Sequence, residues 1–432
     1  MAKGQQRSSA FVPGTGGPEI VSADGSYLIA RDGRRILDAA GGAIVANIGH
    51  GRRPVREAMI RSLERLDYVV PSFSTPERIA LVERLRKDWL PGRLTNVHLS
   101  SGGSEAMDSA LRLVRHHHVL KGEPRRTKII GRDISYHGTT MATLEVGGHD
   151  GRRAPFLSVF DTTPKAPTPY PLRRRDLDCA AALEHIILAE GPDTIAAFVA
   201  EPICGASGGA IVPPADYWPK VQEICRKYGL LLVVDEVMVG FGRTGSRFAL
   251  EQFDIDADIM VAGKGLTAGY APLVGLFATD AVVEPLAAKG ENLMFYTYGG
   301  SSASCAAAEA VLSIMDQEGL IERSARMGEL LAARLQRLAQ HPHVAEVRGR
   351  GLFQAIEIVA DRETLTRFPA EAKVTQKIVA AGLEESVFVY PAGNGTVRDI
   401  VLLGPPFIIT EDEIDTLCAV LERAIDRAIA GV

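Results

Sequence analysis

The run LLLVVDE at residues 230–236 consists of five apolar residues followed by two acids. A short, unbroken run of Leu and Val with polar residues at its end is typical of a strand buried on both faces. A second run of this kind, IMVA at 259–262, leads into Gly263-Lys264-Gly265. Ligands bind beyond the carboxyl ends of strands in parallel sheets. Asp235 and Lys264 are therefore the first candidates for functional residues.

Other parts of the central chain support a sheet covered by helices. Short apolar runs at 97–99, 128–130 and 195–200 are expected to be strands, and helical spacing of apolar residues occurs at 78–89 and 105–117. Strands that alternate with helices indicate an α/β fold with a mostly parallel sheet.

The two ends of the chain have a different pattern. Residues 27–38 alternate like a hairpin around Asp32-Gly33, and strand and helix patterns return after residue 320. We expect strands within 344–358 and 387–400, and helices over 320–339 and 411–429. These flanks predict a smaller α+β domain built from both termini. The expected division is a mobile N-terminal arm (1–18), the N-terminal part of the small domain (19–65), a large domain (66–320) and the C-terminal part of the small domain (321–432).

Composition excludes several classes of protein. The chain has 432 residues, 46% hydrophobic and 23% charged, which argues against wholesale disorder, collagen and coiled coil. A net charge of −5 argues against nucleic-acid binding, and no apolar run approaches the ~18 residues of a membrane span. The five cysteines are scattered, without a Cys-x-x-Cys pair, and residues 1–18 lack the apolar core of a secretory signal. We therefore expect a cytoplasmic protein with reduced thiols.

The sequence SSGGSEA at 100–106 follows an expected strand and opens an expected helix. Two glycines let backbone N–H groups converge, Ser104 adds a hydroxyl, and the N-terminus of a helix is positive. These features suit a phosphate or another anion. Ordinary helix capping is the alternative, because Ser and Gly begin many helices.

Two other ligand classes fit the sequence poorly. A nucleoside triphosphatase needs GxxxxGK followed by Ser or Thr, but Gly265 follows Gly263-Lys264. GFGRTG at 240–245 matches the dinucleotide pattern GxGxxG, but it lies several residues beyond its strand and no clear helix opens on it.

Taken together, the candidate residues suit pyridoxal phosphate. The Gly103–Ser104 turn would hold its phosphate, and Asp235 would keep its ring nitrogen protonated. Lys264, at the mouth of a dry pocket, would lose its proton easily and form a Schiff base with the aldehyde. Tyr136, in Tyr136-His137-Gly138, would offer an aromatic face to the ring.

In these motifs the sequence resembles the class III pyridoxal-phosphate-dependent aminotransferases of fold type I, over about residues 25–428. The matching motifs, in chain order, are Gly103–Ala106, Tyr136-His137-Gly138, Glu201-Pro202-Ile203, Asp235-Glu236-Val237 with Gly240–Gly245, Lys264-Gly265-Leu266, Thr297–Gly300 and Pro405-Pro406. The resemblance implies a large domain with a mostly parallel seven-stranded sheet.

The resemblance also implies a role for each matched residue. Lys264 carries the cofactor in a Schiff base and moves protons, and Asp235 pairs with the pyridine nitrogen. Tyr136 stacks on one face of the ring and Val237 packs on the other, while Gly103 and Ser104 hold the phosphate. Two further cofactor contacts are expected from His137 and from Glu201, which supports the Asp235 network. Thr297 is expected to reach the phosphate of the neighbouring subunit in a homodimer.

Two departures from the family bear on the substrates. Relatives that use glutamate or 2-oxoglutarate carry an Arg three residues before the Pro-Pro pair and a Glu that gates it. Here those positions are Leu402 and Ala206. The absence of both the Arg and the Glu is consistent, because either charge buried without the other would destabilise the protein. The chain is thus closest to the amine or ω-amino acid:pyruvate branch.

Within that branch, Arg398 is the candidate for a mobile arginine that binds the acceptor carboxylate. An exposed loop arginine is the alternative. Ala43, Ile44 and Val45 are expected to line the substrate pocket.

The expected activity is a ping-pong transamination from an amine or ω-amino acid donor to an oxo acid, with pyruvate as the favoured acceptor. Small molecules are the expected partners, together with the second subunit; nucleic acid and membrane are not expected. Alternatives are a glutamate-1-semialdehyde-type aminomutase, a glutamate/2-oxoglutarate-dependent class III aminotransferase, a dialkylglycine-type decarboxylase and a non-enzymatic scaffold.

His116, His117 and His118 do not predict a metal site. Three consecutive helical positions point in different directions, so a shared ion is not expected. We interpret them as a solvated helix end, and we expect no metal.

Overall fold

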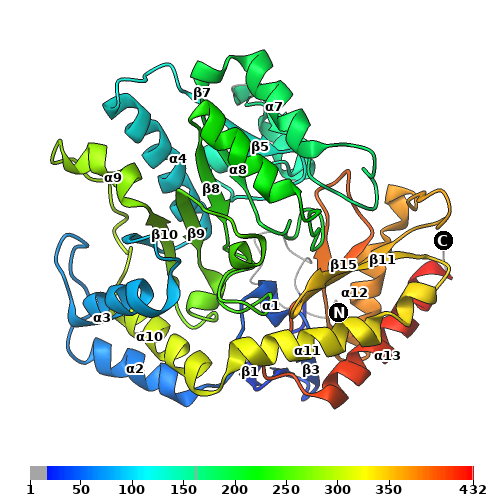
Figure 1. Ribbon diagram of the computed structural model, residues 1–432. Coiled ribbons are helices and arrows are strands. Elements are labelled where there is room, and N and C mark those ends of the chain that lie inside the picture. Colours follow the sequence, from blue (N-terminus) through cyan, green and yellow to red (C-terminus); the bar gives the residue numbers. More distant parts are fainter. Residues whose placement is uncertain (1–16, 161–162, 431) are drawn as a thin grey trace, which may run out of the picture.

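The computed structural model describes residues 17–160, 163–430 and 432 (Figure 1). Its central element is a seven-stranded sheet in the order β4-β10-β9-β8-β7-β5-β6. The parallel strands are β5 to β9, and β10 runs antiparallel to both of its neighbours. The expected mostly parallel α/β sheet is confirmed. Its strands are β4 (Asn96–Ser100), β5 (Lys128–Arg132), β6 (Lys165–Ala166), β7 (Ile195–Ala200), β8 (Leu231–Asp235), β9 (Ile259–Ala262) and β10 (Val274–Ala278).

The sheet is buried on both faces, as its apolar strands require. Val233 of β8 packs with helices α4 and α9, whereas its neighbours Leu232 and Val234 pack with α7 and α8. The alternation follows from the two-residue period of a strand. The helices of this domain are α4 (Gly103–Leu120), α5 (Met141–Val146), α6 (Asp150–Arg153), α7 (Cys179–Glu190), α8 (Tyr217–Tyr228) and α9 (Asp280–Ala287).

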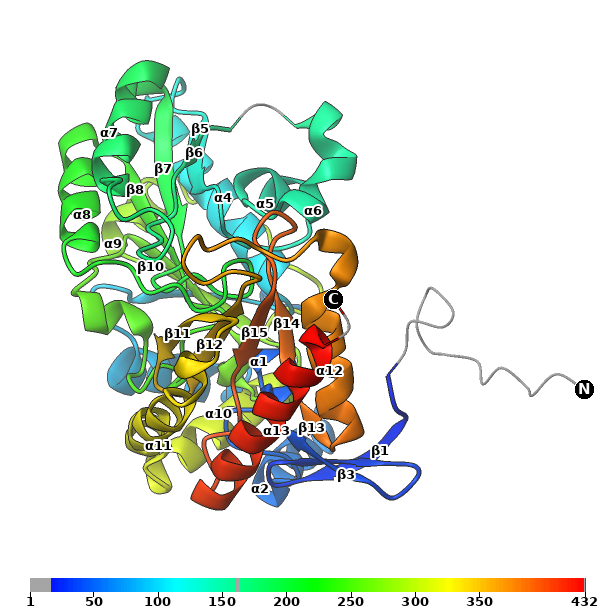
Figure 2. The same cartoon turned by 90° about the vertical axis from the view of Figure 1, so that its right-hand side faces the viewer.

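Strands from the two ends of the chain meet in one further sheet. β13 (Val387–Phe388) pairs in parallel with β3 (Arg35–Asp38), which continues into β2 (Tyr27–Ala30) and β1 (Ile20–Asp24). Figure 2 shows these strands to one side of the large sheet. The expected small domain and its boundaries at 65/66 and 320/321 stay predictions. The arm expected over residues 1–18 lies almost wholly outside the described residues.

The C-terminal region adds a third sheet and three long helices. β11 (Val344–Arg350), β12 (Phe353–Ile358), β15 (Ile400–Leu403) and β14 (Tyr390–Ala392) form an antiparallel sheet in that order. Helices α11 and α12 pack on this sheet, and α13 packs on both of these helices (Figure 1). Thr410 and Glu413 begin α13 with reciprocal side-chain caps, which satisfy its first N–H groups. These helices are α11 (Leu320–Leu335), α12 (Val374–Glu384) and α13 (Glu411–Ile429).

Three of the remaining helices of the described residues pack together. Helix α10 packs on α2 and α3, and a π-helical turn over Leu85–Trp89 extends α3. Their bounds are α1 (Gly41–Ile44), α2 (Arg53–Leu63), α3 (Pro76–Arg84) and α10 (Ser302–Gln317). Among the described residues, no helix has both the length and the apolar character needed to cross a bilayer.

The histidines at the end of α4 differ from the expectation of a solvated helix end. His117 and His118 are buried, and they bond to the carbonyls of Val282 and Ala196. His116 lies outside and contacts Glu291. The rings of His117 and His118 meet edge to face, with their centroids 5.2 Å apart, although they bond to carbonyls on different elements. The described residues contain no cluster of three or more His, Cys, Asp or Glu able to hold a metal.

Candidate active site

A cavity of about 200 Å³ lies where the central strands end. Its walls come from the residues after β4, β5, β7, β8 and β9, as expected for a sheet of this kind. The lining residues are Gly103, Ser104, Tyr136, His137, Gly138, Glu201, Ile203, Ala206, Asp235, Val237, Met238, Val239, Lys264 and Val274. Nine positions predicted for the cofactor from the sequence are Gly103, Ser104, Tyr136, His137, Glu201, Asp235, Val237, Lys264 and Thr297; all but Thr297 lie in this cavity.

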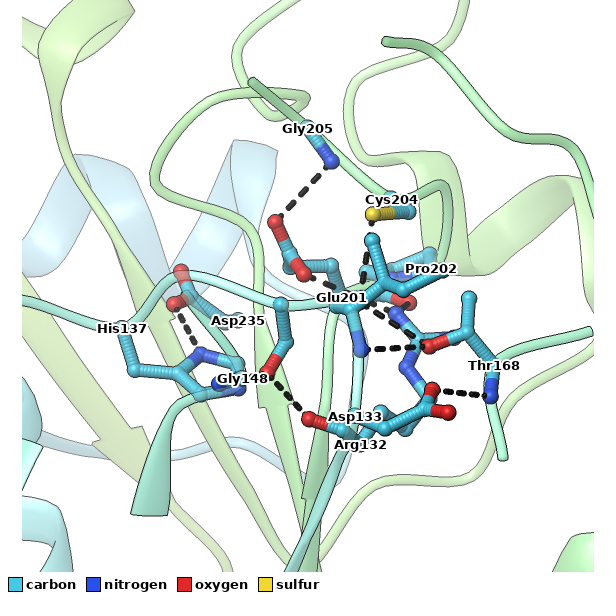
Figure 3. A network of polar contacts seen from close by, with 12 residues as sticks. Arg132, Asp133, His137, Gly148, Thr168, Glu201, Pro202, Cys204, Gly205 and Asp235 are labelled. Atoms are coloured by element: carbon cyan, nitrogen blue, oxygen red, sulfur yellow. Dashed lines mark hydrogen bonds and ion pairs between the residues drawn. The ribbon is translucent and has the colours of Figure 1, made fainter. Parts of the chain in front are cut away.

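Asp235 is the last residue of β8 and is held in one orientation. One carboxylate oxygen lies 2.8 Å from His137 Nδ1, and the other accepts the Val237 N–H at 3.0 Å (Figure 3). The His137 and Asp235 side chains are almost fully buried. His137 Nε2 has no hydrogen-bond partner among the described residues. The pair thus fixes a carboxylate that faces the cavity in a dry setting.

Lys264 follows β9 and has an unusual backbone. Its φ is +43°, in the left-handed region that side chains rarely adopt. Gly265 makes the turn possible, because a Cβ there would lie 2.2 Å from Asn47 Nδ2. Strain of this kind persists where the surrounding structure enforces it, often at functional sites.

The Lys264 amine is poised to lose its proton. Burial lowers its pKa to about 8, with Asp235 acting in the opposite direction and Arg243 adding to the decrease. The Nζ atom donates to the Ala43 carbonyl at 2.9 Å. A neutral amine is the nucleophilic form, so this environment activates Lys264 towards carbonyl compounds.

The N-terminus of α4 is an open turn without a side-chain cap, which suits an anion. Gly102 provides no side-chain cap for this 18-residue helix, which leaves first-turn N–H groups available. Ser104 Oγ accepts the Thr139 N–H at 3.0 Å. Gly138, with φ +139°, lies so close that a Cβ would meet Ser104 Oγ at 2.8 Å. The turn and the Tyr136–Gly138 segment therefore form one surface.

Glu201 follows β7 and is fully enclosed. One oxygen accepts the Gly205 N–H at 2.9 Å, whereas the other lies 3.6 Å from Arg132 and has no hydrogen bond (Figure 3). Burial raises the pKa of Glu201, and the nearby His137 and Arg132 lower it in part. Arg132 donates to the Glu201 carbonyl oxygen at 2.7 Å.

The structure also places residues in and beside the cavity that the sequence did not single out. Arg132 is buried behind Glu201, and Met238 and Val274 complete the apolar wall of the cavity. The strand-end position of Arg132 was the available signal, whereas Val274 begins a strand that the sequence did not predict. Met238 follows the recognised Asp235-Glu236-Val237 motif by one residue.

Several expected substrate residues lie apart from this cavity within one chain. The Ala43 carbonyl contacts Lys264, but Ile44 is buried against Gly404 and none of residues 43–45 lines the cavity. Arg398 donates to the Phe368 carbonyl at 2.9 Å and lies 3.9 Å from Asp399. Their roles in substrate binding stay predictions.

Two positions in this chain lack the charged residues that relatives using glutamate or 2-oxoglutarate carry, and these positions differ in their surroundings. Ala206 lines the cavity, while Leu402 is buried in β15. Thr297 lies in an exposed loop at 291–298. Its role across a subunit interface also stays a prediction.

The comparisons with known proteins agree with this geometry. Residues 17–425 match the family model described as aminotransferase class-III. The putrescine–pyruvate aminotransferase of Pseudomonas aeruginosa is 36% identical, over 96% of this chain and 91% of its own. The diaminobutyrate–2-oxoglutarate transaminase of Halomonas elongata is 35% identical, over 95% and 90%.

The fold comparison gives the same result. The ω-transaminase from Pseudomonas jessenii, in complex with PMP, has a TM-score of 0.92 and 31% identity, with 99% of this chain and 97% of that chain covered. Class III aminotransferases depend on pyridoxal phosphate. The protein is therefore a class III aminotransferase of fold type I.

Proposed function

We propose that the protein transfers an amino group from an amine or ω-amino acid to an oxo acid, with pyruvate as the acceptor, in two successive half-reactions. The observation that carries this proposal is the meeting of Lys264 and Asp235 in one cavity. The Lys264 pKa is lowered to about 8, and the Asp235 carboxylate is held by His137.

The described residues fit pyridoxal 5'-phosphate. The uncapped first turn of α4 would bind its phosphate, with Gly103 and Ser104 as the contacts. Asp235 would pair with its ring nitrogen, and Tyr136 and Val237 would cover its two faces. Bound there, the cofactor supplies an electron sink for the carbon that bears the amino group.

Lys264 and Asp235 then have separate tasks. The Lys264 amine would attach the cofactor aldehyde in the resting enzyme and, once released by the donor, would move the proton of the amine-bearing carbon. Asp235 would hold a proton at the ring nitrogen, and His137 would fix the Asp235 orientation. Glu201, behind them, adds a second carboxyl to the electrostatic surroundings of Lys264.

The choice of acceptor rests on residues 206 and 402. A second carboxylate, as in 2-oxoglutarate, would need a cation in the pocket, and Leu402 and Ala206 supply neither an arginine nor its gate. The names of relatives include both pyruvate and 2-oxoglutarate, so this point needs a direct test. Arg398 would have to leave the Phe368 carbonyl to bind a carboxylate.

We also propose that the working unit is a homodimer in which Thr297 reaches the phosphate site of the partner subunit. The loop that carries Thr297 exposes large apolar side chains on both sides of it: Met294, Phe295 and Tyr298. Such a patch is typical of an interface.

Half-reaction spectroscopy tests this function. Amine donors should shift the absorbance of the cofactor-loaded enzyme, and pyruvate should restore it faster than 2-oxoglutarate. Faster recovery with 2-oxoglutarate would reject the interpretation of Leu402 and Ala206. A product formed without any external oxo acid would favour the aminomutase instead.

A further inference from the structure

Any oxo-acid acceptor brings a carboxylate to the cavity, and that carboxylate needs a cation. The charged residues that line the cavity are Glu201, Asp235 and Lys264. Lys264 is reserved for the chemistry, and the other two are acids. The acceptor cation must therefore come from the rim.

Arg243 is buried near Lys264 but is already engaged. Its guanidinium donates to the carbonyls of Leu352 and Pro405 and to Asn47 Oδ1. It is almost fully buried and packs over the Phe407 ring. Its bonds tie separate segments of the fold together, so Arg243 has a structural function.

Arg152, unlike Arg243, is both exposed and next to a residue that lines the cavity. Its guanidinium lies over the ring of Tyr136, 4.6 Å from the ring centre, and Tyr136 lines the cavity. The Arg152 side chain is exposed, and its guanidinium has no carboxylate or hydrogen-bond acceptor among the described residues. The neighbouring acid, Asp150, instead accepts the Thr396 hydroxyl at 2.6 Å.

The backbone around Arg152 is held firmly. Gly151 N–H donates to the Asn394 carbonyl at 2.8 Å, and the Asn394 side chain donates to the Gly148 carbonyl at 2.9 Å. The segment that carries Arg152 is thereby fastened to the loop before β15. The long side chain is free to reorient while its base stays fixed.

Stacking on an aromatic ring suits an arginine that waits for a carboxylate. A guanidinium has its N–H groups in its own plane, so a ring face orients the group without using its donors. Two parallel N–H···O bonds to a carboxylate remain possible. The Tyr136 ring has two faces, and Arg152 over one leaves the other for the cofactor. His149, nearby, adds no competing charge near pH 7, because burial and Arg152 lower its pKa.

We propose that Arg152, held against Tyr136, binds the carboxylate of the oxo-acid acceptor. This inference rests on the proposed function and adds a substrate-binding residue to it. It assigns to Arg152 the task that the sequence suggested for Arg398. The two arginines can be separated by experiment.

The test compares acceptors with and without a carboxylate in the holoenzyme. Arg152→Gln should raise the KM for pyruvate about tenfold or more, since a charge-assisted hydrogen bond is lost. The KM for butanal, an uncharged aldehyde, should change less than twofold. Arg152→Lys should restore part of the pyruvate affinity, because lysine keeps the positive charge but lacks the two parallel N–H donors of a guanidinium. Propionate should inhibit the wild type more strongly than Arg152→Gln.

Arg153→Gln is the matched control. Arg153 is adjacent and equally charged, but its Nε donates to the Leu144 carbonyl and its guanidinium lies over Phe160. The Arg153→Gln variant should leave the ratio of the KM for pyruvate to the KM for butanal unchanged. Equal effects of Arg152→Gln on pyruvate and butanal, or a selective pyruvate defect in Arg398→Gln alone, would overturn the assignment. A wild type that uses neither acceptor would instead reject the proposed function.

Discussion

At the level of single residues, the lowered pKa of the Lys264 amine bears most directly on the proposed chemistry. Its lowered pKa has a direct consequence for the reaction of cofactor-free protein with pyridoxal phosphate, which requires neutral amine. With a pKa of about 8, the neutral fraction rises about fivefold between pH 7 and 8 and less than twofold between pH 8 and 9.

We therefore expect the rate of cofactor uptake to level off above pH 8. Stopped-flow absorbance measures it, and the rate with Nα-acetyllysine, corrected for the neutral fraction of that ordinary amine, gives the contribution of the cofactor's own ionisation. A rate that keeps rising tenfold per pH unit up to pH 10 would show an ordinary, solvated lysine.

Asp235 and Glu236 are adjacent acids whose side chains have different neighbours, so a variant at one serves as the control for a variant at the other. Asp235→Asn should lower the rate of the amine half-reaction on the order of 100-fold, because the ring nitrogen loses its charged partner. Glu236 instead faces away from the cavity and accepts the N–H groups of Ala249 and Leu250.

Burial raises the pKa of Glu236 to about 8, so Gln resembles its neutral form at pH 7. Glu236→Gln should therefore keep the half-reaction within about threefold of wild type. Single-turnover spectroscopy of both variants checks the pair. Equal losses would mean that strand-end packing, and not the Asp235 charge, controls the reaction.

Single residues could be predicted from the sequence where an apolar run marked the end of a strand beside them. Asp235 stands directly after an apolar run, and Lys264 and Ser104 follow such runs within a few residues, so their shared location follows from sheet geometry. Arg152 lies 16 positions after Tyr136, in the short helix α6, and no period or motif of the sequence connects the two side chains. Only the folded chain brings them together.

The first turn of α4 is the element that we propose holds the cofactor phosphate, so cofactor affinity should depend on it. A Cβ at Gly138 would lie 2.7 Å from Thr143 Oγ1 and 2.8 Å from Ser104 Oγ, and the φ of +139° disfavours any side chain. Gly138→Ala should therefore displace Ser104 and weaken cofactor binding at least tenfold, with a stability loss of about 1–3 kcal/mol.

Gly122→Ala is the control, because Gly122 also has a positive φ but nothing within 4 Å of its added Cβ. Fluorescence titration with pyridoxal phosphate and urea unfolding separate the two effects. A Gly138 variant with normal affinity and reduced stability would remove the turn from the phosphate site.

The sequence predicted the longer parallel strands, whereas the two-residue β6 was not predicted. β5, β7, β8 and β9 are apolar runs between polar residues, and their predicted bounds differ from the structure by two residues at most. β10, with Gly275 in VGLFA, was not predicted although all its residues are buried. Its antiparallel pairing with β4 and β9 depends on contacts far apart in the chain, which no local pattern encodes.

At the scale of the whole molecule, the account requires a second subunit. Phe295 is 51% exposed beside Thr297, so Phe295→Glu should place a charge in the proposed interface and shift the protein towards monomers. Leu188→Glu is the control, since Leu188 is 53% exposed on α7, in a different element of the fold.

Analytical ultracentrifugation at micromolar concentration measures the shift. Monomeric Phe295→Glu should also lose affinity for the cofactor, because Thr297 would no longer reach the partner site. A wild type that sediments as a monomer and still binds the cofactor would contradict the interface.

Borohydride reduction followed by peptide mass spectrometry tests the central claim most directly. Reduction of the purified, yellow enzyme should leave one pyridoxyl phosphate group per chain, on the peptide containing Lys264, and Lys264→Ala should carry none and show no transamination. A label on another lysine, or a Lys264→Ala variant that transaminates at the wild-type rate, would contradict it.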